Sequence, residues 1–220
     1  MLPREPISLL VDNDSWILPH VQALQTALAD LGYAASLCRH ADQVRPGIAC
    51  FMLGCVSLVP EEVLARNKHN LVVHESALPQ GRGFAPMTWQ ILAGRNSIPI
   101  CLLEATAEAD AGPIWLRDSI ELDGSELCDE WRRRQGEATV RLCLDFVQRY
   151  QSLQPQAQQG EASHYRRRGP ADSELDPNLS LAEQFELLRV VDNERYPAFF
   201  HYRGRRYRLA ITPDEGQDHD

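Results

Sequence analysis

The chain has 220 residues, which is enough for one α/β domain with a modest appendage. Charged residues make up 24% and hydrophobic residues 44% of the sequence, as is ordinary for a soluble globular protein. The formal charge of −9, from 22 basic and 31 acidic side chains, argues against general nucleic-acid binding. It leaves room for a local basic pocket that holds a phosphorylated small molecule.

The six cysteines give no sign of a metal or redox site, because no two of them form a C-x-x-C pair. They lie mostly within apolar runs, which indicates buried, reduced thiols. The first residues contain too short an apolar stretch for a signal peptide, and no run reaches transmembrane length. We therefore predict a cytoplasmic protein without a metal or a membrane contact.

The first half of the chain reads as alternating strands and helices. Buried strands are predicted at residues 7–11, 34–38 and 48–53, and a helix capped by Asp14 or Ser15 precedes the stop at Gly32. A short helix, EEVLARN, follows the third strand. This β-α-β opening predicts a Rossmann-like, mostly parallel sheet with helices on both faces and a ligand site beyond the carboxyl ends of its strands.

The second half continues this pattern and then changes in composition. We predict a buried strand at 98–103, two short strands at 113–116 and 119–122, and a long helix at 125–150. A Gln-, Ala- and Pro-rich segment at 151–163 reads as a linker. Beyond it, residues 164–212 predict a small α+β module with a hairpin turning at Arg203-Gly204, and residues 213–220 a disordered tail. Residues 1–150 would then form the main domain.

One stretch, NLVVHESALPQGRGFAP at residues 70–86, carries the pattern of an active site. A short buried strand delivers His74 and Ser76 into a loop rich in Pro and Gly, and a helix-like run, TWQILAG, follows Pro86. Open α/β sheets place polar functional residues in this way, just beyond a strand. On pattern alone, a histidine satisfied within an ordinary strand-to-helix loop explains the stretch equally well.

Two loops resemble those of a known family. The HESALP, GRGFAP and WQILAG segments resemble the active-site loop of formyltransferases that use 10-formyltetrahydrofolate, and ADAGPI resembles that family's second signature. LVPEEVL matches the folate-side loop more loosely. The C-terminal segment from ASHYRRRGPADSELDPN onwards is similar to the extension of members that act on nucleotide-linked amino sugars, notably those of bacterial pseudaminic acid pathways.

The resemblance implies roles for particular residues. Formyl transfer to an amine needs a donor aimed at the oxygen that becomes negative and a group that accepts the amine's proton. His74 suits the first role, and Asp110 suits holding His74 in its useful state and accepting the proton. A turn residue before Gly112 is the plain alternative for Asp110.

The sequence departs from the family at one position. The family normally has an asparagine two residues before the histidine, as a second donor, and here that residue is Val72. Asn70 has the same strand parity but lies roughly 6–7 Å further back along the strand. Ser76, a backbone N–H or His74 alone could serve instead. A non-catalytic pocket that binds folate or a nucleotide sugar is therefore kept as a hypothesis.

Further residues are implied on the two ligand sides, although solvated loops and local packing explain several of them as well. The expected cofactor-binding residues are Ser57, Leu58, Glu104, Ala105 and Glu108. The expected substrate-binding residues are Ser76, Gln80, Arg82, Gly83, Arg166, Arg168, Asn193, Arg195 and Tyr196.

The resulting hypothesis is an N-formyltransferase that uses 10-formyltetrahydrofolate as co-substrate. Its acceptor would be the amino group of a nucleotide-linked deoxyamino sugar, of the UDP-4-amino-4,6-dideoxy-N-acetyl-altrosamine type that occurs in surface glycan or pseudaminic acid pathways. We expect no nucleic acid or membrane partner, and a homodimer is the candidate assembly. Formylation of methionyl-tRNA fits less well, because the chain is acidic and about 57 residues after the linker are short for an RNA-binding barrel domain.

Overall fold

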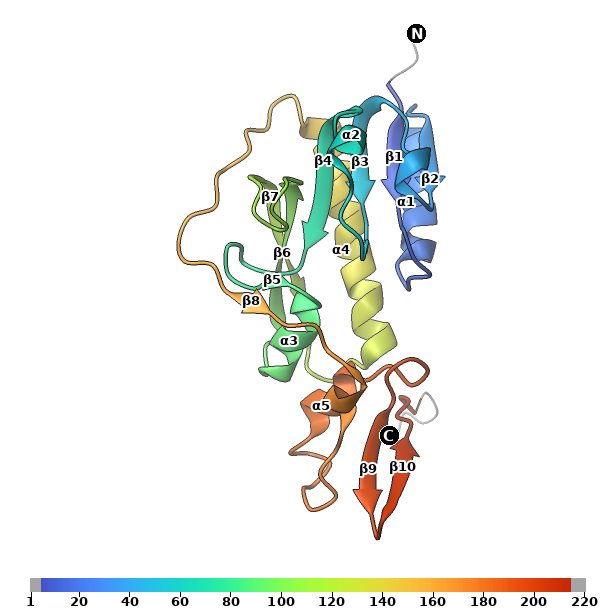
Figure 1. Cartoon of the computed structure of the whole chain (residues 1–220), viewed down its shortest axis with the longest axis vertical. Coiled ribbons are helices and arrows are strands. Elements are labelled where there is room, and N and C mark those ends of the chain that lie inside the picture. The colour runs from blue at the N-terminus through green and yellow to red at the C-terminus, as the bar shows by residue number, and fades with distance from the viewer. Residues whose placement is uncertain (1–4, 215–220) are drawn as a thin grey trace, which may run out of the picture.

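A six-stranded sheet forms the centre of the protein in the computed structural model, which describes residues 5–214 (Figure 1). Its strands lie in the order β2-β1-β3-β4-β6-β7. The first four run parallel, β6 is antiparallel to β4, and β7 is antiparallel to β6. The prediction of a Rossmann-like, mostly parallel α/β fold is confirmed. The bounds are β1 (Ile7–Leu10), β2 (Ala35–Cys38), β3 (Gly47–Met52), β4 (Asn67–His74), β6 (Ser97–Glu104) and β7 (Ile114–Glu121).

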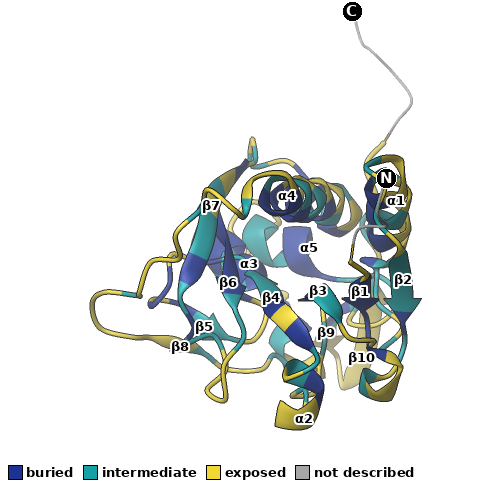
Figure 2. Ribbon diagram, turned by 90° about the horizontal axis from the view of Figure 1, so that it is seen from above, coloured by how far each residue is buried: buried dark blue, intermediate teal, exposed yellow. Residues whose placement is uncertain are grey.

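Helices cover both faces of this sheet (Figure 2). Two long helices, α1 (Leu18–Asp30) and α4 (Cys128–Arg149), pack on one face, where the main apolar cluster buries Leu24 of α1 and Phe146 of α4. The other face carries a smaller cluster that includes Val63 of the short helix α2 (Glu61–Leu64). A 3₁₀ turn, η1 (Ala41–Gln43), lies between β2 and β3.

Two local predictions were wrong. In place of two short strands, Ile114–Glu121 form the single strand β7, because its pairing with β6 continues through the polar Arg117 and Asp118 where the pattern suggested a break. Neither Asp14 nor Ser15 caps α1, which begins at Leu18 without a side-chain cap. The Asp14 carboxylate instead forms an ion pair with Arg39 at 2.8 Å.

Gly136 lies in the middle of α4 for a packing reason. A Cβ at this position would lie 2.4 Å from the His20 ring of α1, so only glycine lets the two helices approach this closely. The cost of a helical glycine, about 1 kcal/mol relative to alanine, is therefore offset by contact between the helices.

The chain returns across the sheet domain after α4. Residues 150–163 lead to β8 (His164–Tyr165), which pairs in parallel with β5 (Arg82–Gly83), just before α3 (Pro86–Leu92). The 3₁₀ turn η2 (Pro170–Ser173) and helix α5 (Phe185–Val190) follow. The Ser180–Glu183 capping box forms, although the helix itself begins only at Phe185. The last strands, β9 (Ala198–Tyr202) and β10 (Arg205–Leu209), make the predicted hairpin.

Arg189 of α5 fastens this C-terminal part to the sheet domain. Its side chain is fully buried and donates to Asn96 at 3.1 Å, to Glu186 at 2.8 Å and to the backbone oxygen of Glu126 at 3.2 Å. Trp131 of α4 donates in turn to the Arg189 backbone oxygen at 2.9 Å. A buried guanidinium is tolerated only with such a set of acceptors, so its loss would leave several buried groups unpaired.

The division into a domain at 1–150, a linker at 151–163 and a module at 164–212 stays a prediction. The expected disordered tail at 213–220 lies outside the described residues from position 215 onwards. Within residues 5–214, no helix has both the length and the apolar character needed to cross a bilayer.

Candidate active site

His74 ends β4 at the carboxyl edge of the sheet, on the face opposite α4. Its register partner on β6 is Cys101, which belongs to the apolar cluster on that same face. The His74 side chain is buried, with 5% of its surface exposed. Its Nε2 lies 2.8 Å from the backbone oxygen of Gly81, and because a carbonyl only accepts, Nε2 must carry the hydrogen. The second ring nitrogen, Nδ1, is therefore the one left for chemistry.

Asp110 faces that nitrogen. Its Oδ1 lies 3.6 Å from His74 Nδ1, too far for a hydrogen bond but close enough for an ion pair once the ring is protonated. Its Oδ2 accepts the backbone N–H of Gly83 at 2.9 Å. Asp110 has the positive φ of 56°, a conformation that a non-glycine residue holds at a cost. The two residues proposed for catalysis are thus brought together.

The glycine loop closes against Tyr165. A Cβ on Gly83, whose φ is +98°, would lie 2.5 Å from the Tyr165 backbone oxygen. Trp89 of α3 stacks on the Tyr165 ring, with 6.1 Å between centroids and 10° between planes. Gly83 and the Tyr165 backbone are therefore in direct contact, with no space for a Cβ between them. Any side chain at Gly83 would push β5 away from β8.

The segment expected to be a linker contributes directly to the site. Gln158 donates from Nε2 to the backbone oxygens of Asp110 at 2.7 Å and of Gly112 at 2.9 Å. Its Oε1 accepts from Arg82 at 2.9 Å. Ser163 Oγ accepts the N–H of Gly81 at 2.9 Å. No sequence pattern singles out Gln158, because it lies in a run of similar glutamines.

The three residues around the family's missing asparagine have distinct surroundings. Val72 packs in the apolar clusters with Leu103. The Asn70 amide donates to the backbone oxygen of Leu64 at 2.9 Å, at the end of α2. Ser76 is buried with 3% exposed, and its hydroxyl has no hydrogen-bond partner among the described residues. A Cβ at Gly81, the residue that holds His74, would lie 3.4 Å from this hydroxyl.

The predicted folate-side loop is held by Asp12, which sequence reasoning missed although it directly follows the first strand. Its carboxylate accepts the N–H groups of Val56 and Ser57, both at 2.9 Å. Partial burial disfavours the charged form, but hydrogen bonds from Asn13 and from these two amides outweigh it and lower the pKa of Asp12. The loop exposes 59% of Val56 and 77% of Leu58, which is apolar area available to a ligand.

The other predicted cofactor residues lie at the end of β6 and in the loop that follows it, and their surroundings differ. The Glu104 carboxylate accepts from the Asn70 backbone at 2.6 Å and from Trp115 at 2.8 Å, on the α4 side of the sheet, so its side chain points away from His74. The Ala105 N–H bonds to the Asn70 backbone oxygen at 2.7 Å. Among described residues, the backbone amides of 106–110 make no backbone hydrogen bonds, which leaves them available to a ligand.

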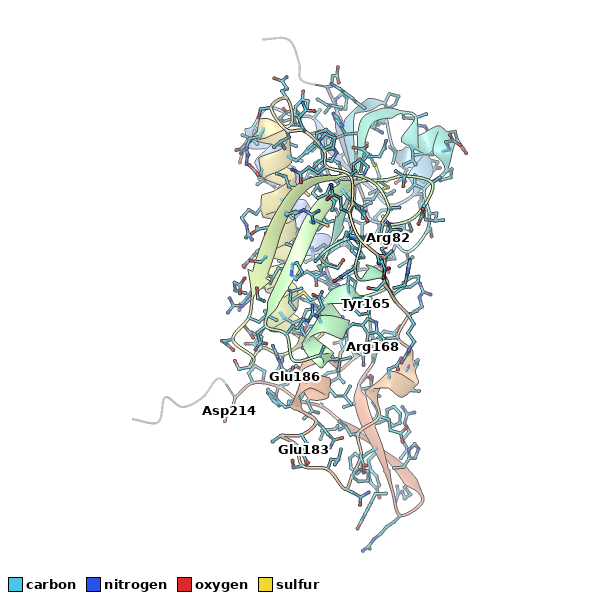
Figure 3. The ribbon with its side chains drawn as sticks, turned by 90° about the vertical axis from the view of Figure 1, so that its left-hand side faces the viewer. Arg82, Tyr165, Arg168, Glu183, Glu186 and Asp214 are labelled. Carbon is cyan, nitrogen blue, oxygen red and sulfur yellow. The ribbon has the colours of Figure 1, made fainter. Side chains whose placement is uncertain are left out.

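Several predicted substrate residues pair with protein groups. Arg82 forms an ion pair with Glu108 at 2.7 Å, which joins a predicted substrate residue to a predicted cofactor residue. Arg166 pairs with Asp172, and these contacts hold the pKa of Asp172 below its usual range. Arg168 donates to the Asp172 backbone oxygen at 2.7 Å. Figure 3 shows Arg82, Tyr165 and Arg168 one below the other on a single face of the molecule. Gln80 is exposed.

The remaining predicted residues lie between α5 and β9. Asn193 uses its side chain to clamp Ile211, donating to its oxygen at 2.7 Å and accepting its N–H at 3.2 Å. Arg195 and Tyr196 line a small cavity together with Arg206 and Arg208, which the sequence analysis did not select. Within residues 5–214 no group of three or more His, Cys, Asp or Glu side chains could hold a metal ion.

An α/β protein with a histidine–carboxylate pair and a glycine-rich loop at the carboxyl edge of its sheet is equipped for transfer chemistry at a carbonyl carbon. Residues 30–147 match the family model described as formyl transferase, so the chain belongs to the formyl transferase family. The resemblance found in the sequence is thereby confirmed, and 10-formyltetrahydrofolate is the formyl donor that this family implies.

Relatives in sequence and structure agree with this placement. The chain is 28% identical over 165 residues to the methionyl-tRNA formyltransferase of Thermus thermophilus, covering 73% of this chain and 53% of the relative. It therefore spans about half the length of the curated relatives it matches.

Three solved structures share the fold, each below 25% identity. Methionyl-tRNA formyltransferase from Clostridium thermocellum gives a TM-score of 0.78 at 20% identity and covers 96% of this chain and 95% of that one. HypX from Aquifex aeolicus in complex with tetrahydrofolic acid gives 0.77 at 17%, covering 94% and 38%. A sugar N-formyltransferase from a Shewanella species gives 0.68 at 14%, covering 96% and 99%.

Proposed function

We propose that this protein transfers the formyl group of 10-formyltetrahydrofolate to the amino group of a nucleotide-linked deoxyamino sugar. The facing pair of His74 Nδ1 and Asp110 Oδ1, 3.6 Å apart at the carboxyl edge of the sheet, is the observation that carries the proposal. In the reaction the amine nitrogen forms a bond to the formyl carbon, and the bond between that carbon and the folate nitrogen breaks. The amine loses one proton and the departing folate nitrogen gains one, so the reaction balances.

The His74–Asp110 pair can accept that proton. Gly81 holds Nε2–H and Gly83 holds Asp110 Oδ2, so one nitrogen and one oxygen remain facing each other. When Nδ1 is protonated, the neighbouring carboxylate stabilises the imidazolium. The same N–H can then donate to an oxygen on which negative charge develops. Proton acceptance and charge stabilisation thus fall to one pair.

The residues present fit the folate co-substrate, which supplies an activated formyl carbon when bound. Val56 and Leu58 offer exposed apolar area for its aromatic rings, and the free backbone amides of 106–110 offer donors beside Asp110. The buried hydroxyl of Ser76, which lacks a partner among the described residues, is the side-chain donor nearest in sequence to His74. We assign it the role of a second donor in place of the amide that Val72 cannot provide.

A nucleotide sugar is supported as the acceptor by one structural relative and by the chain's charge. A sugar N-formyltransferase shares the fold over 96% of this chain, with a TM-score of 0.68. The likeness to the Clostridium enzyme, at 95% of that chain, weighs in the other direction. The formal charge of −9 opposes binding of a transfer RNA. We propose UDP-4-amino-4,6-dideoxy-N-acetyl-altrosamine as the first acceptor to try.

Incubation with 10-formyltetrahydrofolate and this UDP-amino sugar tests the proposal, with mass spectrometry of the sugar nucleotide. We expect a mass increase of one formyl group. Val72, which packs in an apolar cluster, favours one rival function: a folate- or nucleotide-sugar-binding module without chemistry. Tight folate binding with no formylated product from UDP- or dTDP-linked amino sugars, or from methionyl-tRNA, would establish that rival.

A further inference from the structure

A small basic cavity lies on the C-terminal module, formed by the turn at Glu194–Pro197, the start of η2 and strand β10. Its volume is about 260 Å³, near the lower limit of about 300 Å³ for pockets that hold a whole small molecule. The cavity therefore suits a fragment of a ligand. Its lining residues are Pro170, Glu194, Arg195, Tyr196, Pro197, Arg206 and Arg208.

Positive charge dominates this cavity in a protein that is acidic as a whole. Three arginines line it against the single carboxylate of Glu194, while the whole chain has a formal charge of −9. No carboxylate of residues 5–213 forms an ion pair with Arg195, Arg206 or Arg208. Three guanidinium groups that line one small cavity repel one another, so an anion between them would remove an unfavourable interaction.

The three arginines are held in place from outside the cavity. The Arg206 guanidinium lies over the ring of Phe199, 3.8 Å from its centroid, which leaves its N–H edge free. Arg208 donates to the Asn193 backbone oxygen at 3.4 Å, and Arg195 donates to the backbone oxygen of Asp14 in the loop after β1. These contacts are one aromatic ring and two backbone carbonyls, none of which carries a negative charge. Each guanidinium therefore has further N–H donors for a ligand.

The turn that carries Arg195 is also fixed. Asp192 accepts the N–H groups of Glu194 at 3.0 Å and Arg195 at 2.9 Å, and it pairs with Arg132 of α4 at 2.8 Å. Partial burial opposes the charged form, but these hydrogen bonds lower the pKa of Asp192. The cavity is thus preformed, which reduces the entropy lost when a ligand binds.

The cavity connects to the candidate active site along the chain. Residues 164–170 run from β8, which pairs with the glycine loop, to Pro170 in the cavity wall. Figure 3 shows Tyr165 and Arg168 of this segment on the same face as Arg82. We infer that this cavity binds the diphosphate of the nucleotide-linked acceptor, with Arg206 and Arg208 as its main ligands. The inference rests on the proposed function, since it assigns the charged part of that substrate. A doubly charged diphosphate matches forked guanidinium donors in both charge and geometry.

The binding test uses the full-length chain, UDP as probe and isothermal titration calorimetry without any formyl donor. Arg206→Gln and Arg208→Gln should each weaken UDP about tenfold, because each removes charged hydrogen bonds to phosphate. Arg205→Gln is the matched control, since Arg205 is on the same strand but points to the other face of the hairpin and does not line the cavity. Uridine, which lacks phosphate, should bind equally to all variants. Unchanged UDP affinity in both cavity variants would overturn the inference.

A kinetic arm separates the two anionic ligands that could reach this cavity, the diphosphate and the glutamate carboxylates of the folate. Arg206→Gln should raise KM for the UDP-amino sugar about tenfold and leave KM for 10-formyltetrahydrofolate unchanged. A rise only in the folate KM would overturn the assignment to diphosphate. Should no amino sugar be formylated at all, the loss of UDP binding in the cavity variants would still support the diphosphate site, so the two proposals fail separately.

Discussion

Gln158 offers the sharpest test of how this active site is assembled. Its side chain makes three hydrogen bonds, two to the backbone oxygens that flank the turn at Asp110 and one from Arg82. At about 0.5–1.5 kcal/mol for each bond, Gln158→Ala removes roughly 1.5–4.5 kcal/mol of local support. Asp110 has a φ of 56°, which is unfavourable for a residue other than glycine, so its backbone is expected to move to a lower-energy conformation once these hydrogen bonds are lost.

We expect the effect to appear in catalysis more than in stability. If the displacement of Asp110 raises the activation free energy by about 1.4–2.7 kcal/mol of this loss, kcat/KM falls roughly ten- to a hundredfold. Because the loop is at the surface and opens locally, the Tm should fall by less than about 4 °C. Steady-state formylation and thermal unfolding measure the two effects. Gln159→Ala, the same change at an exposed neighbour, is the control and should match the unmodified protein.

The reasoning predicts a specific split between kinetic parameters. KM for the formyl donor should change little, because Gln158 contacts the Asp110 loop through backbone oxygens only. Gln158→Glu, which keeps the shape but loses the two donors, should behave like the alanine variant. Wild-type kcat in both variants would refute the idea that the segment at 151–163 positions Asp110.

Five further variants test other parts of the site. His74→Ala and Asp110→Ala should each abolish measurable formylation or lower kcat at least a hundred- to a thousandfold while the protein stays folded; normal turnover in either would remove the pair from its assigned roles. Ser76→Ala should lower kcat about tenfold or more without lowering the Tm, since its hydroxyl has no hydrogen-bond partner among the described residues to lose. A loss of stability without a loss of rate would show that Ser76 has a structural role. Gly83→Ala should lower the free energy of unfolding by about 1–3 kcal/mol in a urea titration, because its Cβ would lie 2.5 Å from the Tyr165 backbone oxygen. An unchanged urea midpoint would show that β5 and β8 can separate without cost. Burial raises the pKa of the Glu75 carboxyl, against the influence of His74 and Gln135, so the folded state holds that proton more tightly than the unfolded chain. Its stabilising contribution is therefore complete below the ordinary value near 4.5 and is lost as pH rises through the folded-state pKa, and Glu75→Gln should raise the Tm at pH 7 but not at pH 4.

The sheet was predictable because its strands are short apolar runs that alternate with helical patterns. The runs around Leu9, Phe51 and Leu102 are buried in one core, as their composition suggested. The unbroken β7 was missed because Arg117 and Asp118 look like a turn, whereas pairing with β6 compensates for their polarity. Tertiary pairing of this kind leaves no local signal in a sequence.

Within the site, the sequence could identify the residues at the ends of strands but not those that reach them from afar. His74 ends the buried strand β4, and Asp110 lies in the loop after β6. Because β6 runs antiparallel to β4, strand order alone does not bring the two residues together, and the family resemblance was needed to pair them. Gln158 lies 48 residues after Asp110 in a segment whose composition is that of a spacer. Arg206 and Arg208 alternate on an exposed strand, a pattern that surface charge also produces, and only the folded hairpin shows that they share a cavity.

The pairing of β5 with β8 has a consequence for how the protein is made. Strand β5 lies early in the chain and its partner lies more than 80 residues later, so the glycine loop cannot be fixed until residue 165 has left the ribosome. A nascent chain that ends at residue 150 already contains every strand of the sheet and both long helices. Domains form in this order during synthesis, and the sheet can therefore fold before the reaction centre exists. The protein would become active in a late and separate step, when the returning segment closes over His74.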